Sequence, residues 1–424
     1  MLRTLRDLLL LVRKTFRNVT RTDKTAAVSG IRADLHIPLV LVGLIFMCNL
    51  RAATWYVSPS GADANPGTPD QPFRTVAQGV AVAAPGDTIL LADGIYGAEG
   101  HTEFAVHIRS SGTPTAWITL KAQNKGGAIL DCQNVTDAPQ TGCQGYIYLD
   151  TGAAYWVFQD LVFQHEYTVG IDSNSVPSAH DILVRGCRFE YIGQHPSFAP
   201  FGEAGFYAGP GGYNMTFDSN VFHDIGRDSG TYISHDHGLY LHSSSTTIVN
   251  NIFYAPITGW GVQTASGFGG LIANNTFALV MNNNGGQLML WDNDGSITVR
   301  NNIFYNPNRG YAVNTSGFTT SGACSVDHNL VFGGTPGTVA PCSVNGNFTG
   351  DPQFVNASSP PYDFHLQAGS PAIGNGVPIP NLTYDFDGNP RPQNAPPDIG
   401  ALQYQPPAAA QVRRPQQLRP SRAR

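Results

Sequence analysis

A short phrase recurs seven times along this chain of 424 residues. Each copy has β-branched or aromatic residues, then a polar residue that is most often Asn, and then an apolar residue; the copies are VFQDLV, LVRGCRF, TFDSNVF, IVNNIF, LIANNTF, TVRNNIF and SVDHNLV. The aligned positions are Asp160, Cys187, Asn220, Asn251, Asn275, Asn302 and Asn329, separated by 27, 33, 31, 24, 27 and 27 residues. Such a period is typical of a solenoid in which each repeat is one coil.

The pattern inside each repeat favours strands over helices. Short β-rich runs alternate with polar turns, and Gly-led strands such as GLYLH and GVQTA lie between the copies. One coil cannot bury its apolar face alone, so stacked coils share a continuous core, and Asn at a repeated turn can form a side-chain ladder. We therefore predict an all-β parallel β-helix over residues 54–350, in which the repeated Asn and Phe residues are structural.

Both ends of an open stack need covers, because they expose unpaired strand edges. Residues 74–84 (RTVAQGVAVAA) form an amphipathic stretch before a Pro-Gly-Asp turn, which predicts a short N-terminal cap helix. Residues 351–404 lose the repeat and become rich in Pro, Gly and Asp, so we expect them to close the C-terminal end.

The two termini differ in composition from the body. Residues 1–53 hold nine Lys or Arg against three acids, then the apolar run Ile37–Met47, which predicts an export signal. This run is shorter than the roughly 20 residues that a membrane anchor needs, and Cys48 follows Met47 where a lipid-attachment site would want a small residue. Residues 405–424 are mostly Pro, Gln and Arg, which predicts a disordered tail. We expect a secreted, cell-surface or periplasmic protein.

Charge and cysteine content narrow the partners and the compartment. Residues 54–404 hold ten Lys or Arg against 27 Asp or Glu, a net charge of −17 that repels nucleic acid. Cys132 and Cys143, and likewise Cys324 and Cys342, are close enough in sequence to close short loops in an oxidising compartment. Cys187 is left over, and the alternative of reduced core thiols stays open.

Two segments carry a resemblance to a known family. The opening TWYVSPSGADANPGTPDQPFRTVAQGVAVAAPGDTILLADGIY resembles the first segment of many secreted bacterial right-handed β-helix proteins, including polysaccharide lyases and some glycosidases. The closing DPQFVNASSPPYDFHLQAGSPAIGNG, with DFDGNPRP and DIGALQY, resembles the choice-of-anchor-type C-terminal segment of many such proteins. The chain is thus identified as a member of the pectate-lyase-like superfamily of single-stranded right-handed parallel β-helices. The resemblance implies a polysaccharide partner but no one reaction, and we expect a monomer.

Two stretched spacings mark where a site could be built, because loops on a rigid scaffold carry function. The inserts between Cys187 and Asn251 are YIGQHPSFAPFGEAG and HDIGRDSGTYISHDHG. They concentrate titratable groups in a chain that is only 13% charged, namely His195, Glu203, His223, Asp224, Arg227, Asp228, His235, Asp236 and His237.

Alignment of the Gly-led strands on their glycine sorts side chains by face. The second position points inward in this alignment (Ile171, Phe206, Leu239, Val262, Leu288 and Tyr311). The third and fifth then point outward, and this set contains Asp172, Asn174, Tyr207, Tyr240, His242, Gln263, Met289 and Trp291. Aromatic rings with polar tips suit sugar faces, so we predict that this stripe and Glu203 bind glycan. Ordinary exposed strand surface is the alternative.

For β-elimination on a uronic acid polymer, a base must take the C5 proton and a cation must neutralise the sugar carboxylate. The body has only two lysines, both upstream of the inserts, so we predict a histidine base, His237 or His235. Tyr240 is the predicted proton donor and Arg227 the predicted partner of the substrate carboxylate. Candidate calcium ligands are Asp224, Asp228 and Asp236.

Two other function classes stay open. A glycoside hydrolase needs a carboxylate pair, for which Asp172, Glu203, Asp224, Asp228 and Asp236 are candidates. A non-catalytic binding or surface protein needs only the stripe. The acidic body also keeps neutral glycans among the candidate substrates.

Overall fold

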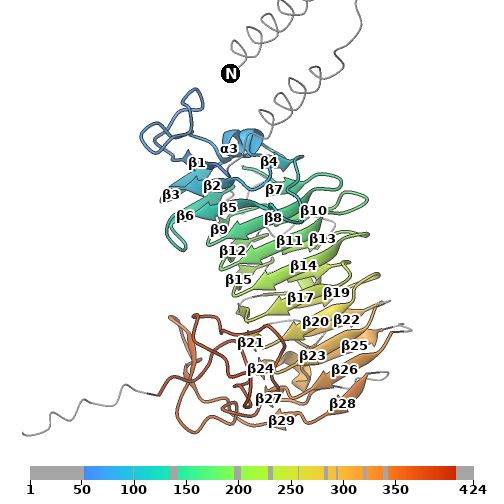
Figure 1. Cartoon of the computed structure of the whole chain (residues 1–424). Coiled ribbons are helices and arrows are strands. Elements are labelled where there is room, and N and C mark those ends of the chain that lie inside the picture. The colour runs from blue at the N-terminus through green and yellow to red at the C-terminus, as the bar shows by residue number, and fades with distance from the viewer. Residues whose placement is uncertain are drawn as a thin grey trace, which may run out of the picture. The chain divides into compact units, whose positions relative to one another are not determined.

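The computed structural model describes residues 52–406 except 99, 134–141, 195–201, 228–232, 256, 281–284, 293–294, 319–321 and 338–341. The predicted export signal and tail lie almost wholly outside these residues. The described chain winds into coils of three strands, and strands of successive coils pair in parallel to form three long sheets (Figure 1). The predicted all-β parallel β-helix is confirmed.

Between β2 and β25, each coil contributes one strand to each long sheet, in the order A, B, C. Sheet A contains β1 (Thr54–Val57), β2 (Thr88–Leu91), β5 (Ile118–Ala122), β8 (Ala154–Gln159), β11 (His180–Arg185), β14 (Tyr213–Asp218), β17 (Thr246–Val249), β20 (Gly270–Ala273), β23 (Ile297–Arg300), β26 (Cys324–Asp327) and β28 (Ser343–Asn345). Sheet B contains β3 (Gly94–Gly97), β6 (Ala128–Asp131), β9 (Val162–Gln164), β12 (Arg188–Ile192), β15 (Val221–Ile225), β18 (Ile252–Tyr254), β21 (Thr276–Ala278), β24 (Ile303–Tyr305), β27 (Leu330–Phe332) and β29 (Phe348–Thr349).

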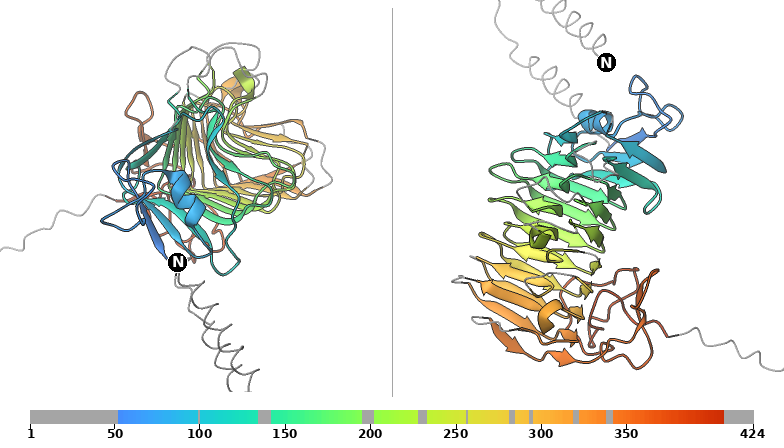
Figure 2. Two further views of the ribbon diagram at one scale, coloured as in Figure 1. Left: turned by 90° about the horizontal axis from the view of Figure 1, so that it is seen from above. Right: turned by 180° about the vertical axis from the view of Figure 1, so that it is seen from behind.

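Sheet C carries the Gly-led strands of the sequence pattern. It contains β4 (Phe104–Ile108), β7 (Gly145–Leu149), β10 (Val169–Ser173), β13 (Ala204–Ala208), β16 (His237–Leu241), β19 (Val262–Thr264), β22 (Leu288–Trp291) and β25 (Val313–Gly317). Short 3₁₀ turns occupy Ile233–His235 and Asn308–Gly310. Seen along the axis, the three sheets enclose the core (Figure 2).

The core explains why Phe and Gly recur together. Six phenylalanines of sheet B stack inside the coil with ring centroids 4.7–4.9 Å apart, namely Phe163, Phe189, Phe222, Phe253, Phe277 and Phe304. A Cβ at Gly238 would lie 2.5 Å from the carbonyl oxygen of Gly261 and 2.9 Å from the ring of Phe253. Only glycine lets this part of the strand approach the rings.

The predicted asparagine ladder is confirmed at the turn between sheets A and B. Each Oδ1 accepts the backbone N–H and the side-chain N–H of the Asn one coil earlier, as Asn275 does from Asn251 at 2.9 and 3.0 Å. The ladder contains Asn220, Asn251, Asn275, Asn302, Asn329 and Asn347. Cys187 occupies the ladder position in the coil before Asn220, and its backbone N–H donates to the side chain of Asn220. In the coil before, Leu161 takes this place rather than the predicted Asp160, because Val162 pairs with Arg188.

The cap helix predicted over residues 74–84 is confirmed as α3 (Val76–Val82), beside β4 at the N-terminal end (Figure 1). Thr75 is its N-cap and accepts a hydrogen bond from the backbone N–H of Gln78, which satisfies one of the free donors of the first turn. Within the described residues, no helix is long and apolar enough to cross a membrane.

Residues 351–404 pack along the flank of the last coils, over the outer face of sheet B (Figure 1). They contain an antiparallel pair, β30 (Phe354–Asn356) and β31 (Asp363–Leu366). Three ladder residues, Asn251, Asn275 and Asn302, are preceded by a second Asn that holds this segment. Asn274 donates to the carbonyl oxygen of Asp398, and Asn301 to that of Val377. In each Asn-Asn pair of the repeat, the second Asn therefore belongs to the ladder and the first binds the C-terminal segment.

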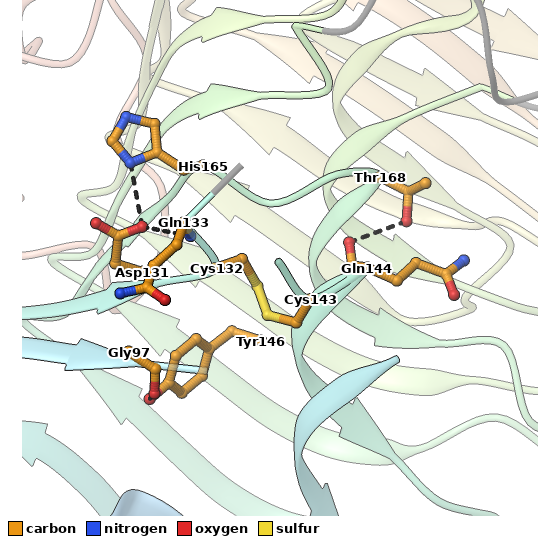
Figure 3. Close-up of a disulfide and its surroundings, with 9 residues drawn as sticks. All are labelled: Gly97, Asp131, Cys132, Gln133, Cys143, Gln144, Tyr146, His165 and Thr168. Carbon is orange, nitrogen blue, oxygen red and sulfur yellow. Dashed lines mark hydrogen bonds and ion pairs between the residues drawn. A yellow bond between two sulfur atoms is a disulfide. The ribbon is translucent and has the colours of Figure 1, made fainter. Parts of the chain in front are cut away.

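Both predicted disulfides are present. Cys132, which follows β6, is bonded to Cys143, which precedes β7 (Figure 3). Cys324 is bonded to Cys342, and Cys187 is a buried free thiol. The first bond closes a turn between sheets B and C, which is the same corner of the coil that carries the two inserts.

Candidate functional site

One outward-facing row of side chains crosses sheet C from coil to coil. Strand pairing aligns Tyr148 with Asp172, Asp172 with Tyr207, and onward in register. We call this row the sheet C column; it contains His107, Tyr148, Asp172, Tyr207, Tyr240, Gln263, Met289 and Asn314. The predicted outward positions Asp172, Tyr207, Tyr240, Gln263 and Met289 all belong to it. The stripe predicted from alternation is therefore one continuous row.

The fifth positions follow the same face with one correction. Asn174 is exposed, His242 is half-buried with its Nδ1 3.2 Å from the carbonyl oxygen of Ser266, and Trp291 is 45% exposed. The last strand was misaligned, because Val313, not Tyr311, pairs with Leu288 and takes the inward place. Tyr311 lies before β25, and the residue before the inward Val313 is Ala312, so alignment on Gly310 shifted this strand.

Asp172 is the most perturbed acid of the sheet C column. Its Oδ1 is buried and has no hydrogen-bond partner. Burial raises the pKa of this carboxyl to about 7, although a hydrogen bond from the backbone N–H of Asn174 lowers it in part. A carboxyl with a pKa near neutrality can accept or donate a proton at physiological pH, which is the property of a general base or acid.

Tyrosines lie on both sides of Asp172. Tyr207 is in register with it and packs against Tyr240 with ring centroids 5.2 Å apart. Burial, and then the neighbouring Tyr240 and Asp172, raise the pKa of Tyr207 to about 12. Burial also raises the pKa of Tyr148, and the charges of Asp172 and Asp150 add to this. These phenols therefore stay protonated and are proton donors on a face that also offers aromatic rings.

Arg227 does not face the sheet C column. It is 2% exposed and lies in the corner between sheets B and C. Its Nη2 is 2.8 Å from Oδ1 of Asp236 and 3.2 Å from Oε1 of Glu203, and its Nε donates to Oδ2 of Asp236 at 2.9 Å. Arg227, the predicted partner of the substrate carboxylate, thus binds two buried carboxyl groups of the protein itself. Glu203 is one of them, and this burial is unsuited to both of its predicted roles, in glycan binding and in a hydrolytic pair.

His237 is a weak base at neutral pH, and its free nitrogen is already engaged. It is 2% exposed, and its Nδ1 accepts the backbone N–H of Trp260 at 3.1 Å. Burial, with a smaller contribution from His235, lowers the pKa of His237 to about 3. The imidazole is therefore neutral with its proton on Nε2, and the lone pair of Nδ1 is engaged. His235 is exposed at the end of a 3₁₀ turn.

The described calcium candidates do not converge. Asp224 lies on the outer face of sheet B, 2.5 Å from Nδ1 of His223, whose Nε2 is 2.9 Å from Glu190. Asp236 is held by Arg227, while Asp228 and His195 lie outside the described residues. Across the part of the chain that is described, no group of three acidic, His or Cys side chains could hold a metal ion. These residues do not fit the six to eight oxygen ligands that calcium prefers.

Sequence reasoning missed the N-terminal part of the column. Tyr148 and His107 are in register with Asp172, and Phe104 packs against both rings at 4.9 and 6.1 Å. The run GYIYL carried the signal, since its alternation places Ile147 inward and Tyr148 outward. Alignment on the glycine alone shifts this strand by one residue and hides it.

Comparison with known proteins agrees with this architecture. The chain is 32% identical over 117 residues to pectate lyase PEL9 of Emericella nidulans, covering 26% of this chain and 27% of that enzyme. The chain therefore spans about a quarter of the length of this curated relative.

Two solved structures share the fold. The crystal structure of pectate lyase Pel9A has a TM-score of 0.51 at 18% identity, covering 84% of this chain and 98% of that one. The alginate lyase of Paenibacillus sp. str. FPU-7 has a TM-score of 0.52 at 15% identity, covering 70% and 95%. The model of the family described as Pel9A-like, right handed beta helix region, matches residues 55–331. Since this match spans more than half of the chain, the protein belongs to the Pel9A-like right-handed β-helix family and is pectate-lyase-like in fold.

Proposed function

We propose that this protein is a polysaccharide lyase that cleaves a uronic-acid-containing glycan lying along the sheet C column, with Asp172 as the base. The observation that most supports this proposal is the carboxyl of Asp172, which has a pKa near 7 and lies between tyrosines on an open sheet face. The names of the family, of PEL9 and of both structural neighbours support the lyase class. A glycan parallel to the axis would meet one column residue every ~4.8 Å, the spacing between strands.

In this reaction the ionised Asp172 carboxylate removes the C5 proton of the uronic acid. The C4–O4 bond breaks, a C4–C5 double bond forms, and the leaving oxygen takes a proton from Tyr207 or Tyr240. Tyr207 is suited to this because the pKa raised to about 12 keeps its proton in place until the leaving group develops charge.

The test uses the full chain with polygalacturonate, alginate and a neutral glycan, each with and without calcium. A lyase raises the ultraviolet absorbance, because elimination makes an unsaturated sugar. Asp172→Asn should lower this rate by ~100-fold or more, the range for loss of a general base. The control is Asp181→Asn, an aspartate of the next strand, on sheet A, which should keep the rate.

The outcomes separate the function classes. An ultraviolet signal that survives in Asp172→Asn would remove Asp172 as the base. New reducing ends without ultraviolet absorbance would replace the lyase by a hydrolase. Glycan binding without either product would make the protein a non-catalytic binder.

One observation favours the hydrolase as the second candidate. The charges of both Asp172 and Asp150 act on Tyr148, so two carboxyls lie near one phenol. Asp150 has different neighbours from Asp172, because it contacts His107 at 3.2 Å and Arg109 at 3.5 Å. Two acids with unlike environments are the arrangement by which glycosidases divide acid and base roles.

We also propose that the protein is exported, with residues 1–53 as the signal. The basic and apolar segments of this region and the two disulfides of the body support an oxidising destination. N-terminal sequencing of the protein from the culture medium of a secreting bacterium should give a mature start near Thr54. Retention inside the cell with Met1 intact would overturn this.

A further inference from the structure

A cavity of about 750 Å³ lies where the sheet C column meets the cap helix. One wall is α3, through Ala77, Val80 and Ala81, and the other is β4, through Phe104, His107 and Arg109. His107 is also the first described member of the sheet C column. The cavity is therefore the N-terminal end of the face on which the glycan is proposed to lie, and its volume is in the range of small-ligand sites.

The lining combines aromatic and basic side chains that can bind an acidic sugar, with Glu103 as the one carboxyl group among the residues that line it. Phe104 packs against the ring of Tyr148 at 4.9 Å, so the aromatic surface continues from the column into the cavity. The Arg109 side chain is 72% exposed and has a 3.5 Å contact to Asp150, which leaves most of its fork of N–H donors facing solvent. A guanidinium in this setting can bind a sugar carboxylate through two parallel hydrogen bonds.

The position of the cavity relative to Asp172 sets a length. His107, Tyr148 and Asp172 lie in register on three successive coils. Asp172 is thus two coils from the cavity, or ~10 Å at the usual strand spacing. An extended pyranose chain advances by roughly one coil per sugar, so a chain end in the cavity places the second or third linkage beside Asp172.

We propose that this cavity binds the end of the acidic glycan, that α3 blocks the chain from continuing, and that the enzyme therefore releases short oligosaccharides of one length. This inference rests on the proposed lyase function. It adds a chain-end subsite with Arg109 and Phe104 as its binding residues.

Two readouts test it. The first follows products of polygalacturonate by anion-exchange chromatography from the earliest times. One dominant unsaturated oligomer of two or three sugars should appear at once while the viscosity falls slowly. The second measures digalacturonate binding by calorimetry, which does not need turnover.

Two variants and one control are compared in both measurements. Arg109→Gln should weaken digalacturonate binding by ~10-fold or more, in proportion to the loss of one charged hydrogen-bonding group. Ala81→Trp fills the cavity from an exposed position of α3 and should abolish that binding and the dominant product. Arg185→Gln, which changes an arginine on sheet A paired with Asp218, should leave both unchanged.

Failure of the subsite and failure of the lyase look different. Random product lengths with a fast viscosity drop, unchanged in Ala81→Trp, would overturn the chain-end subsite and leave the lyase standing. Digalacturonate binding that is lost in Arg109→Gln, without any unsaturated product, would support the subsite and overturn the lyase. Absence of binding in the unmodified chain would overturn the subsite directly.

Discussion

At the scale of single residues, burial gives acids of one chain opposite uses. Asp172 is half-buried beside phenols, and one of its carboxyl oxygens is buried without a hydrogen-bond partner, so its pKa rises towards neutrality. Glu203 and Asp236 are buried more completely, and burial raises the pKa of both, but Arg227 lies between them and offsets part of this rise. The proton of Asp172 can therefore be exchanged near neutral pH. The group of Arg227, Glu203 and Asp236 instead holds the corner of the coil that precedes the strands of sheet C.

The pKa of Asp172 predicts a pH dependence of stability. An unfolded Asp ionises near pH ~3.9, whereas Asp172 in the folded protein holds its proton up to about pH 7. Between these values the folded state binds the extra proton, so the free energy of unfolding falls as pH rises. Asp172→Asn lacks this loss and should be more stable than the parent by ~1–3 kcal/mol at pH 8, with little difference at pH 4. Thermal unfolding at both pH values measures this, and an equal difference at both would contradict it.

Replacement of Arg227 should have the opposite effect on the free energy of unfolding. Arg227→Met leaves two buried carboxylates without a cation and should cost ~3–5 kcal/mol at neutral pH. The loss should shrink at pH 4, where those carboxyls take up protons. The matched control is Arg188→Met, since Arg188 also contacts a glutamate, at 2.8 Å, but is 44% exposed; its cost should be below ~1 kcal/mol. Urea unfolding compares the two, and equal costs would show that the corner ion group is not special.

At the scale of elements, the turn between sheets A and B carries the repeat. Each ladder Asn accepts from a backbone N–H in the coil before it and donates to a carbonyl oxygen of an earlier coil, as Asn275 does to Ile248. Asn275 also donates to Ala273 of its own coil. Coil stacking is therefore specified by side chains at one corner as well as by the sheets.

Replacement of one ladder residue should be costly in the middle and cheap at the end. Asn275→Leu leaves the buried N–H of Asn251 without its acceptor and removes several further bonds, which should cost ~3–5 kcal/mol in total at ~1–3 kcal/mol per unsatisfied buried group. Asn347→Leu, on the half-buried last turn, should cost less than half as much. Denaturant unfolding measures both, and similar costs would argue against the ladder as a cooperative element.

The coil could be predicted because its sequence pattern recurs. The site could not be predicted in the turns that do not follow this pattern. Stacked Phe and Asn, the cap helix and the outward place of Asp172 all follow from period and alternation. Arg227 lies in a turn of unique length and His237 begins the strand after it, so their partners, Asp236 and the backbone of Trp260, depend on how the turns close in space. No pattern in one sequence encodes that closure, which is why residues chosen for their chemistry proved to be buried.

At the scale of the whole molecule, residues 351–404 complete the surface. The outer face of sheet B changes along the axis from the charged network of Glu190 and His223 to apolar side chains in the last coils, and the C-terminal segment covers the latter. Arg391 anchors it, since the guanidinium donates to Asn250 and to the carbonyl oxygens of Gly400 and Ala401.

Loss of this anchor should expose apolar surface. Arg391→Ala removes a buried cation that makes several hydrogen bonds, so the segment should detach more readily and dye binding to apolar surface should rise well below the unfolding temperature. Lys125→Ala is the control, because Lys125 contacts the same segment only through the ring of Phe386 at 4.8 Å. An unchanged dye signal in Arg391→Ala would show that the apolar packing alone holds the segment.

The same segment alters how the molecule resists force. A stack of coils pulled from one end opens one coil at a time, because each coil contacts only its neighbours. Here Asn250, Asn274 and Asn301, on three successive coils, all hold the segment, so a pull on the C-terminus loads several coils together in shear. A protein held by its C-terminal end on a surface would thus keep its glycan-facing sheet intact under drag that would peel a bare solenoid.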